Sequence, residues 1–111
     1  NWYGLLGGRR NVFHQDIHTI VTELAMMIAP TLVILDGFDV MISNGPTGGS
    51  TSDLIQKNTI IVGTDQVAVD TLGAQLLNLT PEKLPYLKKA EKAGVGTTKI
   101  NVLKPIKYSE A

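Results

Sequence analysis

The sequence predicts an α/β domain with a layered, mostly parallel central sheet and helices packed on it. Three observations lead to this fold class. Apolar residues recur at helical spacing in long segments, short aliphatic runs alternate with those segments, and glycine-rich turns separate the two kinds. The chain has 111 residues, the length of one domain, so residues 1–111 are expected to form a single α/β unit around one core.

The first part of the chain is predicted to be a loop, a helix and a strand. Residues 1–12 are rich in glycine, which favours a loop. From His14 to Ala29, apolar residues follow the spacing of an amphipathic helix, and Pro30 ends it by removing an amide donor. Residues 31–35 form a short aliphatic run, which predicts a strand buried on both faces as in a parallel sheet.

The middle of the chain is predicted to be a loop, a second strand and a long helix. Residues 43–50 form a loop by composition, and residues 58–62 are the second aliphatic run. Thr64 or Asp65 can cap the helix that follows, because both side chains accept a hydrogen bond from a free amide of the first turn. This helix is expected to run to about Leu77.

The last part of the chain is predicted to be a helix and a strand. Thr80 followed by Pro81 marks a helix start, with a cap residue and a proline in the first turn. Pro85 interrupts or restarts that helix, which is expected to end before Gly94. Residues 98–103 alternate weakly between apolar and polar side chains, so we expect a last strand there.

The composition excludes several classes of partner and cofactor. Ten Lys and Arg residues balance ten Asp and Glu residues, so the surplus of cations that binds nucleic acid is missing. The chain contains 0 Cys, so it supplies no thiolate to an iron–sulfur cluster or a zinc site. No apolar run reaches the roughly 18 residues that span a bilayer. We therefore expect neither nucleic acid nor a membrane as partner.

The start of the chain leaves the compartment open. The first residue is Asn1 rather than Met, and no charged leader precedes an apolar run. We expect that a segment upstream has been lost. The cytoplasm is then the default compartment, with export as the alternative if that segment was a signal.

Carboxylates follow both aliphatic runs. Asp36 follows the first, and Asp65 follows the second next to Thr64. If the two strands are parallel neighbours, both carboxylates lie on one rim of the sheet, where open α/β sheets bind ligands. Asp70 lies about 140° around the helix from Asp65, so those two do not share a face. The structural alternatives are a helix cap for Asp65 and a turn for Asp36.

The loop at residues 44–49, with the sequence Asn-Gly-Pro-Thr-Gly-Gly, is a second candidate site. Its glycines let backbone amides approach a ligand closely, and a row of amides can hold an anion. Asn44, Gly45 and Gly48 are the candidate ligand-binding residues. The alternative is an ordinary turn between two strands, since these residue types are the usual ones in turns.

Two pairs of basic side chains lie near the start of the chain. Arg9 and Arg10 can hold a carboxylate or phosphate, and the alternative is a solvated turn. His14 and His18 are four residues apart on the predicted helix, a spacing that can place two imidazoles on one divalent metal. A histidine there can also act as an acid or base near neutral pH, and the alternative is a pair of ordinary surface histidines.

Several motifs in this order resemble a known family, the bacterial and archaeal domain of unknown function numbered 362. The resemblance covers residues 1 to about 103. Its motifs are the Asn-Trp-Tyr-Gly-Leu-Leu start with Arg9, Arg10 and His14, the loop at 44–49, the segment Gly-Thr-Asp-Gln-Val-Ala-Val-Asp at 63–70, and residues 85–87 and 93–96. The chain departs from the family pattern at Gln66, where many members have Pro, and at Ile42-Ser43, where many have Glu-Gly.

The resemblance implies that the chain is the C-terminal part of a larger domain. Members are commonly iron–sulfur proteins or are fused to ferredoxin-like modules. A cluster would then belong to a part outside this chain. The implied partners are the missing N-terminal half or a ferredoxin-like module, and a half-domain with uncovered surface is expected to form a dimer or larger assembly.

Two functions follow from these residues together with what the resemblance implies. The first is part of an iron–sulfur-associated redox or metal-dependent enzyme, in which a divalent metal is a candidate cofactor. The second is a non-catalytic module that binds a ligand or a partner protein. For the first, the catalytic candidates are Asp36, Asp65 and His14, and the ligand-binding candidates are Arg9, Arg10, Asn44, Gly45, Gly48, Thr64 and Asp70.

Overall fold

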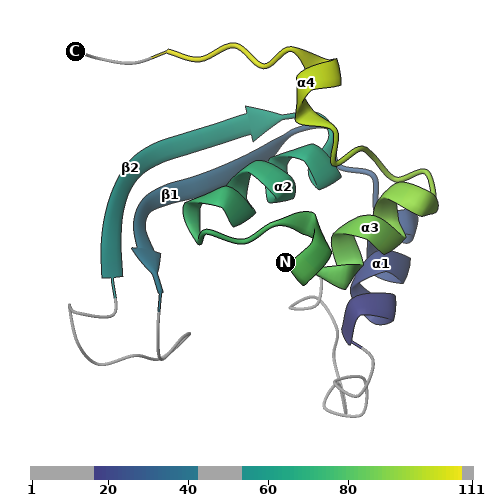
Figure 1. Ribbon diagram of the computed structural model, residues 1–111. Coiled ribbons are helices and arrows are strands. Elements are labelled where there is room, and N and C mark those ends of the chain that lie inside the picture. Colours follow the sequence, from purple (N-terminus) through teal and green to yellow (C-terminus); the bar gives the residue numbers. More distant parts are fainter. Residues whose placement is uncertain (1–16, 43–53, 109–111) are drawn as a thin grey trace.

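A computed structural model of the chain describes residues 17–42 and 54–108. Figure 1 shows two long strands beside helix α2, with helices α1 and α3 packed against each other at one end. No helix in these two ranges is long and apolar enough to cross a membrane. The elements in chain order are α1 (Ile17–Met27), β1 (Val33–Met41), β2 (Leu54–Gly63), α2 (Gln66–Leu76), the 3-10 turn η4 (Pro81–Lys83), α3 (Pro85–Lys92) and α4 (Ile100–Leu103).

The direction of the strands corrects the predicted fold class. β1 and β2 form a two-stranded antiparallel sheet, so the prediction of a mostly parallel central sheet was wrong. Parallel neighbours need a long crossover, usually a helix. The sequence between Met41 and Leu54 contains Asn-Gly-Pro and Gly-Gly, which favour a turn over a helix. A connection without a crossover helix lets β2 run antiparallel to β1.

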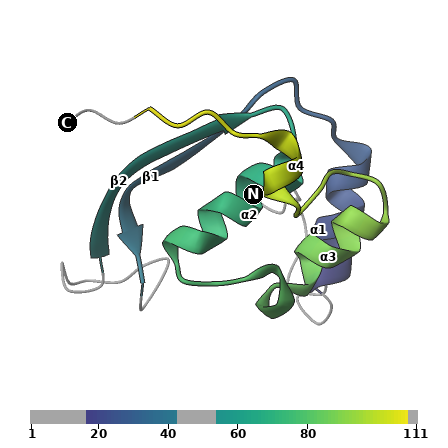
Figure 2. The same cartoon turned by 45° about the horizontal axis from the view of Figure 1, so that its top comes forward.

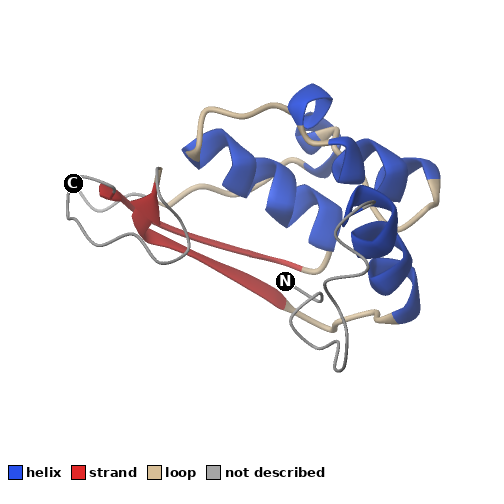
Figure 3. Cartoon of the chain, turned by 90° about the horizontal axis from the view of Figure 1, so that it is seen from below, coloured by secondary structure: helices blue, strands red, loops and turns tan. Residues whose placement is uncertain are grey.

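The sheet is covered on one face. Figures 2 and 3 show the helices on one side of the two strands. On the other face, Ile34 is 64% exposed, Ile60 54% and Val62 58%, and the register sets Ile34 directly opposite Val62. The prediction that residues 31–35 form a strand buried on both faces was therefore wrong. The alternating exposure is typical of an antiparallel sheet with one open face.

Helix α2 lies close against the inner face of β1 because two glycines face the contact. A Cβ atom at Gly73 would overlap the side chain of Leu35 in β1, and one at Gly37 would lie 2.5 Å from Cδ1 of Leu76 in α2. Neither position has room for a larger residue. The close approach brings the buried face of α2 between the sheet and α3, where Val67 packs with Leu87.

Helix α2 ends where the sequence predicted. Asn78 adopts a left-handed conformation with φ of 58°, and the Leu79 amide donates to the Ala74 carbonyl at 2.9 Å. Asparagine tolerates this conformation better than most residues, so it ends a helix almost as glycine does. The predicted end near Leu77 is confirmed.

The predicted last strand is wrong. Residues 100–103 form the short helix α4. The amide and hydroxyl groups of Thr98 both donate to the Glu91 carboxylate, and the Thr97 amide donates to Asp65. A strand ladder would need these backbone donors, so the segment is held as a loop before α4 begins.

Candidate functional site

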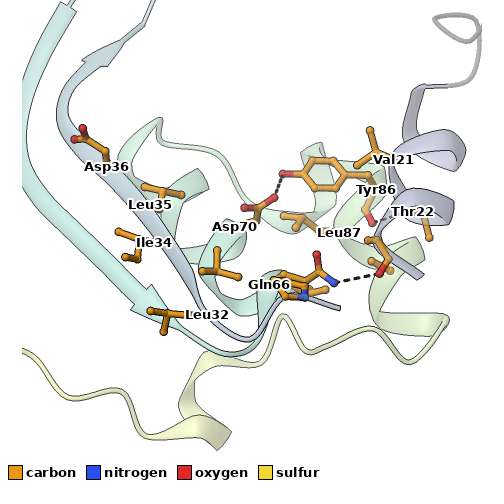
Figure 4. Close-up of a pocket in the computed structure, with 15 residues that line it drawn as sticks. Val21, Thr22, Leu32, Ile34, Leu35, Asp36, Gln66, Asp70, Tyr86 and Leu87 are labelled. Atoms are coloured by element: carbon orange, nitrogen blue, oxygen red, sulfur yellow. Dashed lines mark hydrogen bonds between the residues drawn. The ribbon is translucent and has the colours of Figure 1, made fainter. Parts of the chain in front are cut away.

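A hollow follows β1 on the side of helices α1 and α3. One part has a volume of about 620 Å³ and lies between the start of β1 and helices α1, α2 and α3. A second part, about 440 Å³, follows β1 as far as Met41. Leu35, Asp36, Asp70 and Tyr86 line both parts, so the two are neighbours. Figure 4 shows the first part, with Asp70 and Tyr86 pointing toward each other.

Asp70 and Tyr86 form the polar centre of this hollow. The Tyr86 hydroxyl donates to Oδ2 of Asp70 at 3.1 Å. Burial, and then the neighbouring Asp70 carboxylate, raises the pKa of the Tyr86 hydroxyl well above its usual range. Tyr86 therefore keeps its proton near neutral pH and acts as a hydrogen-bond donor rather than as a base.

His18 holds the other side of Tyr86. Its ring stacks on the Tyr86 ring with centroids 6.1 Å apart, and its Nδ1 accepts a hydrogen bond from the Tyr86 amide at 3.2 Å. An accepting Nδ1 carries no proton, so the neutral ring carries it on Nε2. His18 thus fixes α1 to the start of α3. His14, its predicted partner in metal binding, lies outside the described residues.

Asp65 is the N-cap of α2. Its Oδ1 accepts from the Ala68 amide at 2.9 Å, and its Oδ2 accepts from the Thr97 amide at 3.1 Å. The cap prediction is therefore confirmed for Asp65, while Thr64 is exposed before the helix. Both carboxylate oxygens of Asp65 bind backbone. Its proposed catalytic role, and the ligand-binding role of Thr64, stay predictions.

The structure does not bring Asp36 and Asp65 to a common rim. Asp36 lies within β1 opposite Ile60, whereas Asp65 comes two residues after Gly63, the last residue of β2. That expectation depended on parallel strands, and the carboxyl ends of antiparallel strands lie at opposite ends of the sheet. Oδ1 of Asp36 instead accepts from the Phe38 amide at 3.0 Å, beside the irregular register between Gly37 and Asp39. Asp36 shares the hollow with Asp70.

The charged side chains of the hollow have one sign. Asp36, Asp39 and Asp70 line it, and no Lys, Arg or His is part of the described lining. Most of the remaining wall is aliphatic, including Val21 and Leu87. Within residues 17–42 and 54–108, no three His, Cys, Asp or Glu side chains converge as a metal site would require. The hollow is therefore an apolar groove with an acidic border.

Six predicted site residues lie outside the part of the chain that the structure describes. The predictions made for these residues from the sequence therefore stay predictions. They are Arg9, Arg10, His14, Asn44, Gly45 and Gly48.

Sequence reasoning did not select Tyr86 or Gln66 as site residues. The side-chain amide of Gln66 donates to the carbonyl oxygens of Ala25 at 3.2 Å and Ile28 at 3.4 Å, which ties α2 to the end of α1. A Pro side chain has no such donor, so the departure from the family pattern at this position adds a contact between helices. The only sequence signal for Tyr86 was its place in the Pro-Tyr-Leu segment at 85–87.

Comparisons with known proteins identify relatives of the chain. The family described as Domain of unknown function (DUF362) matches residues 1–75, which include α1, both strands and most of α2. The protein named Thylakoid-associated protein sll1697, from Synechocystis sp., is 28% identical over 107 residues, which are 96% of this chain and 31% of that protein. The chain thus spans about a third of the length of that relative. No solved structure matches this chain.

Proposed function

This chain belongs to the DUF362 family, and on that premise we propose that it is a binding module within a longer protein. The observation that carries this proposal is the open face of the sheet. Ile34, Ile60 and Val62 lie together on that face, each more than half exposed. Contiguous apolar surface of this kind is typical of a surface that another protein segment covers.

The small core supports the same function. Among the described residues, Leu87 is the largest side chain that is fully buried, and much of the rest of the core is Ala and Val. Larger side chains such as Phe38 and Leu103 stay 45% and 48% exposed. Helix α2 covers only the inner face of the two-stranded sheet, and the apolar side chains of the outer face stay exposed. A partner that covers the outer face would bury them.

The length of the relative indicates where the partner comes from. About two thirds of the Synechocystis protein lies outside the region that matches this chain. We propose that the equivalent part of the longer protein covers the open face. That relative is named for its association with thylakoids. An iron–sulfur cluster in the longer protein would be bound outside this chain, which has 0 Cys.

The oligomeric state of the isolated chain tests this proposal. Without its partner, the chain is expected to self-associate through the open face and to bind an apolar dye. The Ile60→Thr/Val62→Thr variant keeps β-branched side chains and should sediment as a monomer with little change in melting temperature. Ile106→Thr is the control, because Ile106 is 79% exposed but lies outside the sheet. A monomeric parent chain that binds no dye would contradict the proposal.

A redox or metal-dependent enzyme is the second candidate. One observation favours it: within the hollow, the Asp70 carboxylate accepts a hydrogen bond from a Tyr86 hydroxyl that keeps its proton. If a divalent metal binds there, it should raise the melting temperature, and Asp70→Asn should remove that increase. Asp65→Asn is the control, since it should lower the melting temperature without removing the increase caused by metal.

A further inference from the structure

The free edge of β1 faces the hollow. In the described part of the chain, β1 pairs only with β2. A strand edge without a neighbour presents amide and carbonyl groups that can pair with an added strand. The residues that line the hollow beside this edge determine which kind of strand can pair with β1.

The lining shows that the hollow runs along the edge of β1. It includes the consecutive residues from Leu32 to Asp36, and nearly all of those from Leu35 to Met41. Successive side chains of a strand point to opposite faces of the sheet. A space lined by consecutive residues therefore lies against the strand edge, because a space on one face would be lined by every second residue.

The walls of the hollow define the chemistry of its occupant. Opposite β1 the wall is largely aliphatic, with Val21 and Ala25 from α1 and Leu87 and Ala90 from α3. The charged side chains of the border are acidic, although the whole chain has a net charge of +0. An occupant with aliphatic side chains and at least one Lys or Arg complements both features.

We propose that the free edge of β1 receives an extended aliphatic segment carrying Lys or Arg, from the part of the longer protein outside this chain. This inference rests on the proposed function and names the partner's chemistry. Two observations support this occupant: the acidic border of the hollow, and the roughly two thirds of the relative that lie outside the matched region. Such a segment extends the sheet to three strands, while Asp36 and Asp39 pair with its basic side chains.

A synthetic peptide tests this inference. The probe is a labelled, end-capped peptide Val-Lys-Val-Thr-Val-Lys-Val, and its counterpart has Glu in place of Lys. Fluorescence anisotropy measures binding to the full 111-residue chain, and hydrogen exchange locates the protected amides. The Lys peptide should bind and slow exchange in β1. Asp39→Lys should weaken binding by about fivefold, as expected when an exposed ion pair is lost and replaced by repulsion.

Two further variants make the test specific. Asp36→Lys should weaken binding as well, and Glu23→Lys is the matched control, because Glu23 is an exposed residue of α1 that does not line the hollow. Equal binding of the Glu peptide, or protection of β2 in place of β1, would overturn the inference. So would failure of both peptides to bind. That failure, with self-association through Ile60 and Val62 intact, would overturn this inference and leave the proposed function standing.

A second copy of the chain is the competing occupant. If the Lys peptide dissociated self-associated chains, the edge would be occupied by another copy, and the inference would be overturned. Binding of the peptide to the monomeric Ile60→Thr/Val62→Thr variant, with exchange slowed in β1, would support it.

Discussion

Tyr86 is the residue that connects the elements around the hollow. Its hydroxyl binds Asp70 of α2, its amide binds His18 of α1, and its ring stacks on His18. One side chain and its own amide thus join three helices beside β1. Tyr86 also lines both parts of the hollow, together with Asp70.

Removing the Tyr86 hydroxyl is expected to destabilise the chain. Tyr86→Phe keeps the ring and removes the bond to Asp70, so the free energy of unfolding should fall by about 1 kcal/mol. The raised pKa means that the contribution of this bond is present below about pH 10 and is lost as the pH rises through the folded pKa. Alkaline absorbance should show a tyrosine that ionises above the usual range, and Tyr86→Phe should remove that component. A titration unchanged by the substitution would contradict this assignment.

At the scale of elements, two carboxylates fix the loop after α3 to the start of α2. Asp65 accepts from the Thr97 amide, and Glu91 accepts from both the amide and the hydroxyl of Thr98. Gly96 comes directly before these two threonines, and a Cβ atom there would be 2.8 Å from Cγ of Asp65 and 2.9 Å from Cβ of Val67. The absence of a side chain at this position lets the loop approach the helix cap.

Gly96→Ala should therefore displace the loop. We expect a loss of about 2–3 kcal/mol in the free energy of unfolding, because the added methyl meets a cap carboxylate and a core side chain. Gly94→Ala is the control. Gly94 has φ of 83°, and a Cβ atom added there would meet no other atom within 4 Å, so only backbone strain of about 1 kcal/mol applies. Urea denaturation of both variants measures the difference, and equal losses would argue against crowding at Gly96.

The Glu91 carboxylate should make the contribution of the same loop to stability depend on pH. Hydrogen bonds from the Thr98 amide, then from its hydroxyl, lower the pKa of the Glu91 carboxyl below its ordinary value of 4.5. Its contribution to stability is therefore present above about pH 4.5 and lost as the pH falls through the folded pKa. Glu91→Gln should flatten the acid side of a plot of melting temperature against pH. Lys88→Ala removes only a charge 3.9 Å away, so a larger effect from it would reverse the assigned order of causes.

At the scale of the whole molecule, the buried residues and the large exposed ones lie in different places. The core lies where α2 meets α3 and the inner face of the sheet, with Leu87 only 1% exposed. The outer face of the sheet and the segment after α4 carry exposed apolar side chains such as Ile34 and Ile106. This division is the molecular basis for the proposed binding module.

Substitutions at two aliphatic residues should separate core from interface. Leu87→Ala is expected to reduce the free energy of unfolding by about 3 kcal/mol, since it leaves a cavity in the core. Ile34→Ala in the monomeric Ile60→Thr/Val62→Thr background should change it by less than about 1 kcal/mol, because Ile34 is 64% exposed. Chemical denaturation measures both values. A loss at Ile34 as large as that at Leu87 would mean that the outer face is covered within the chain itself.

The sequence by itself determined the local features of this protein. Asp65 and Asn78 mark the two ends of α2, and the clusters of aliphatic residues mark both strands, because caps, left-handed residues and apolar runs act over a few neighbours. The motifs also identified the family. Tertiary structure decided the direction of the strands and the partners of the carboxylates. Asp70 meets Tyr86 only because α3 packs beside α2, and a contact of that kind depends on packing between distant segments rather than on spacing along the chain.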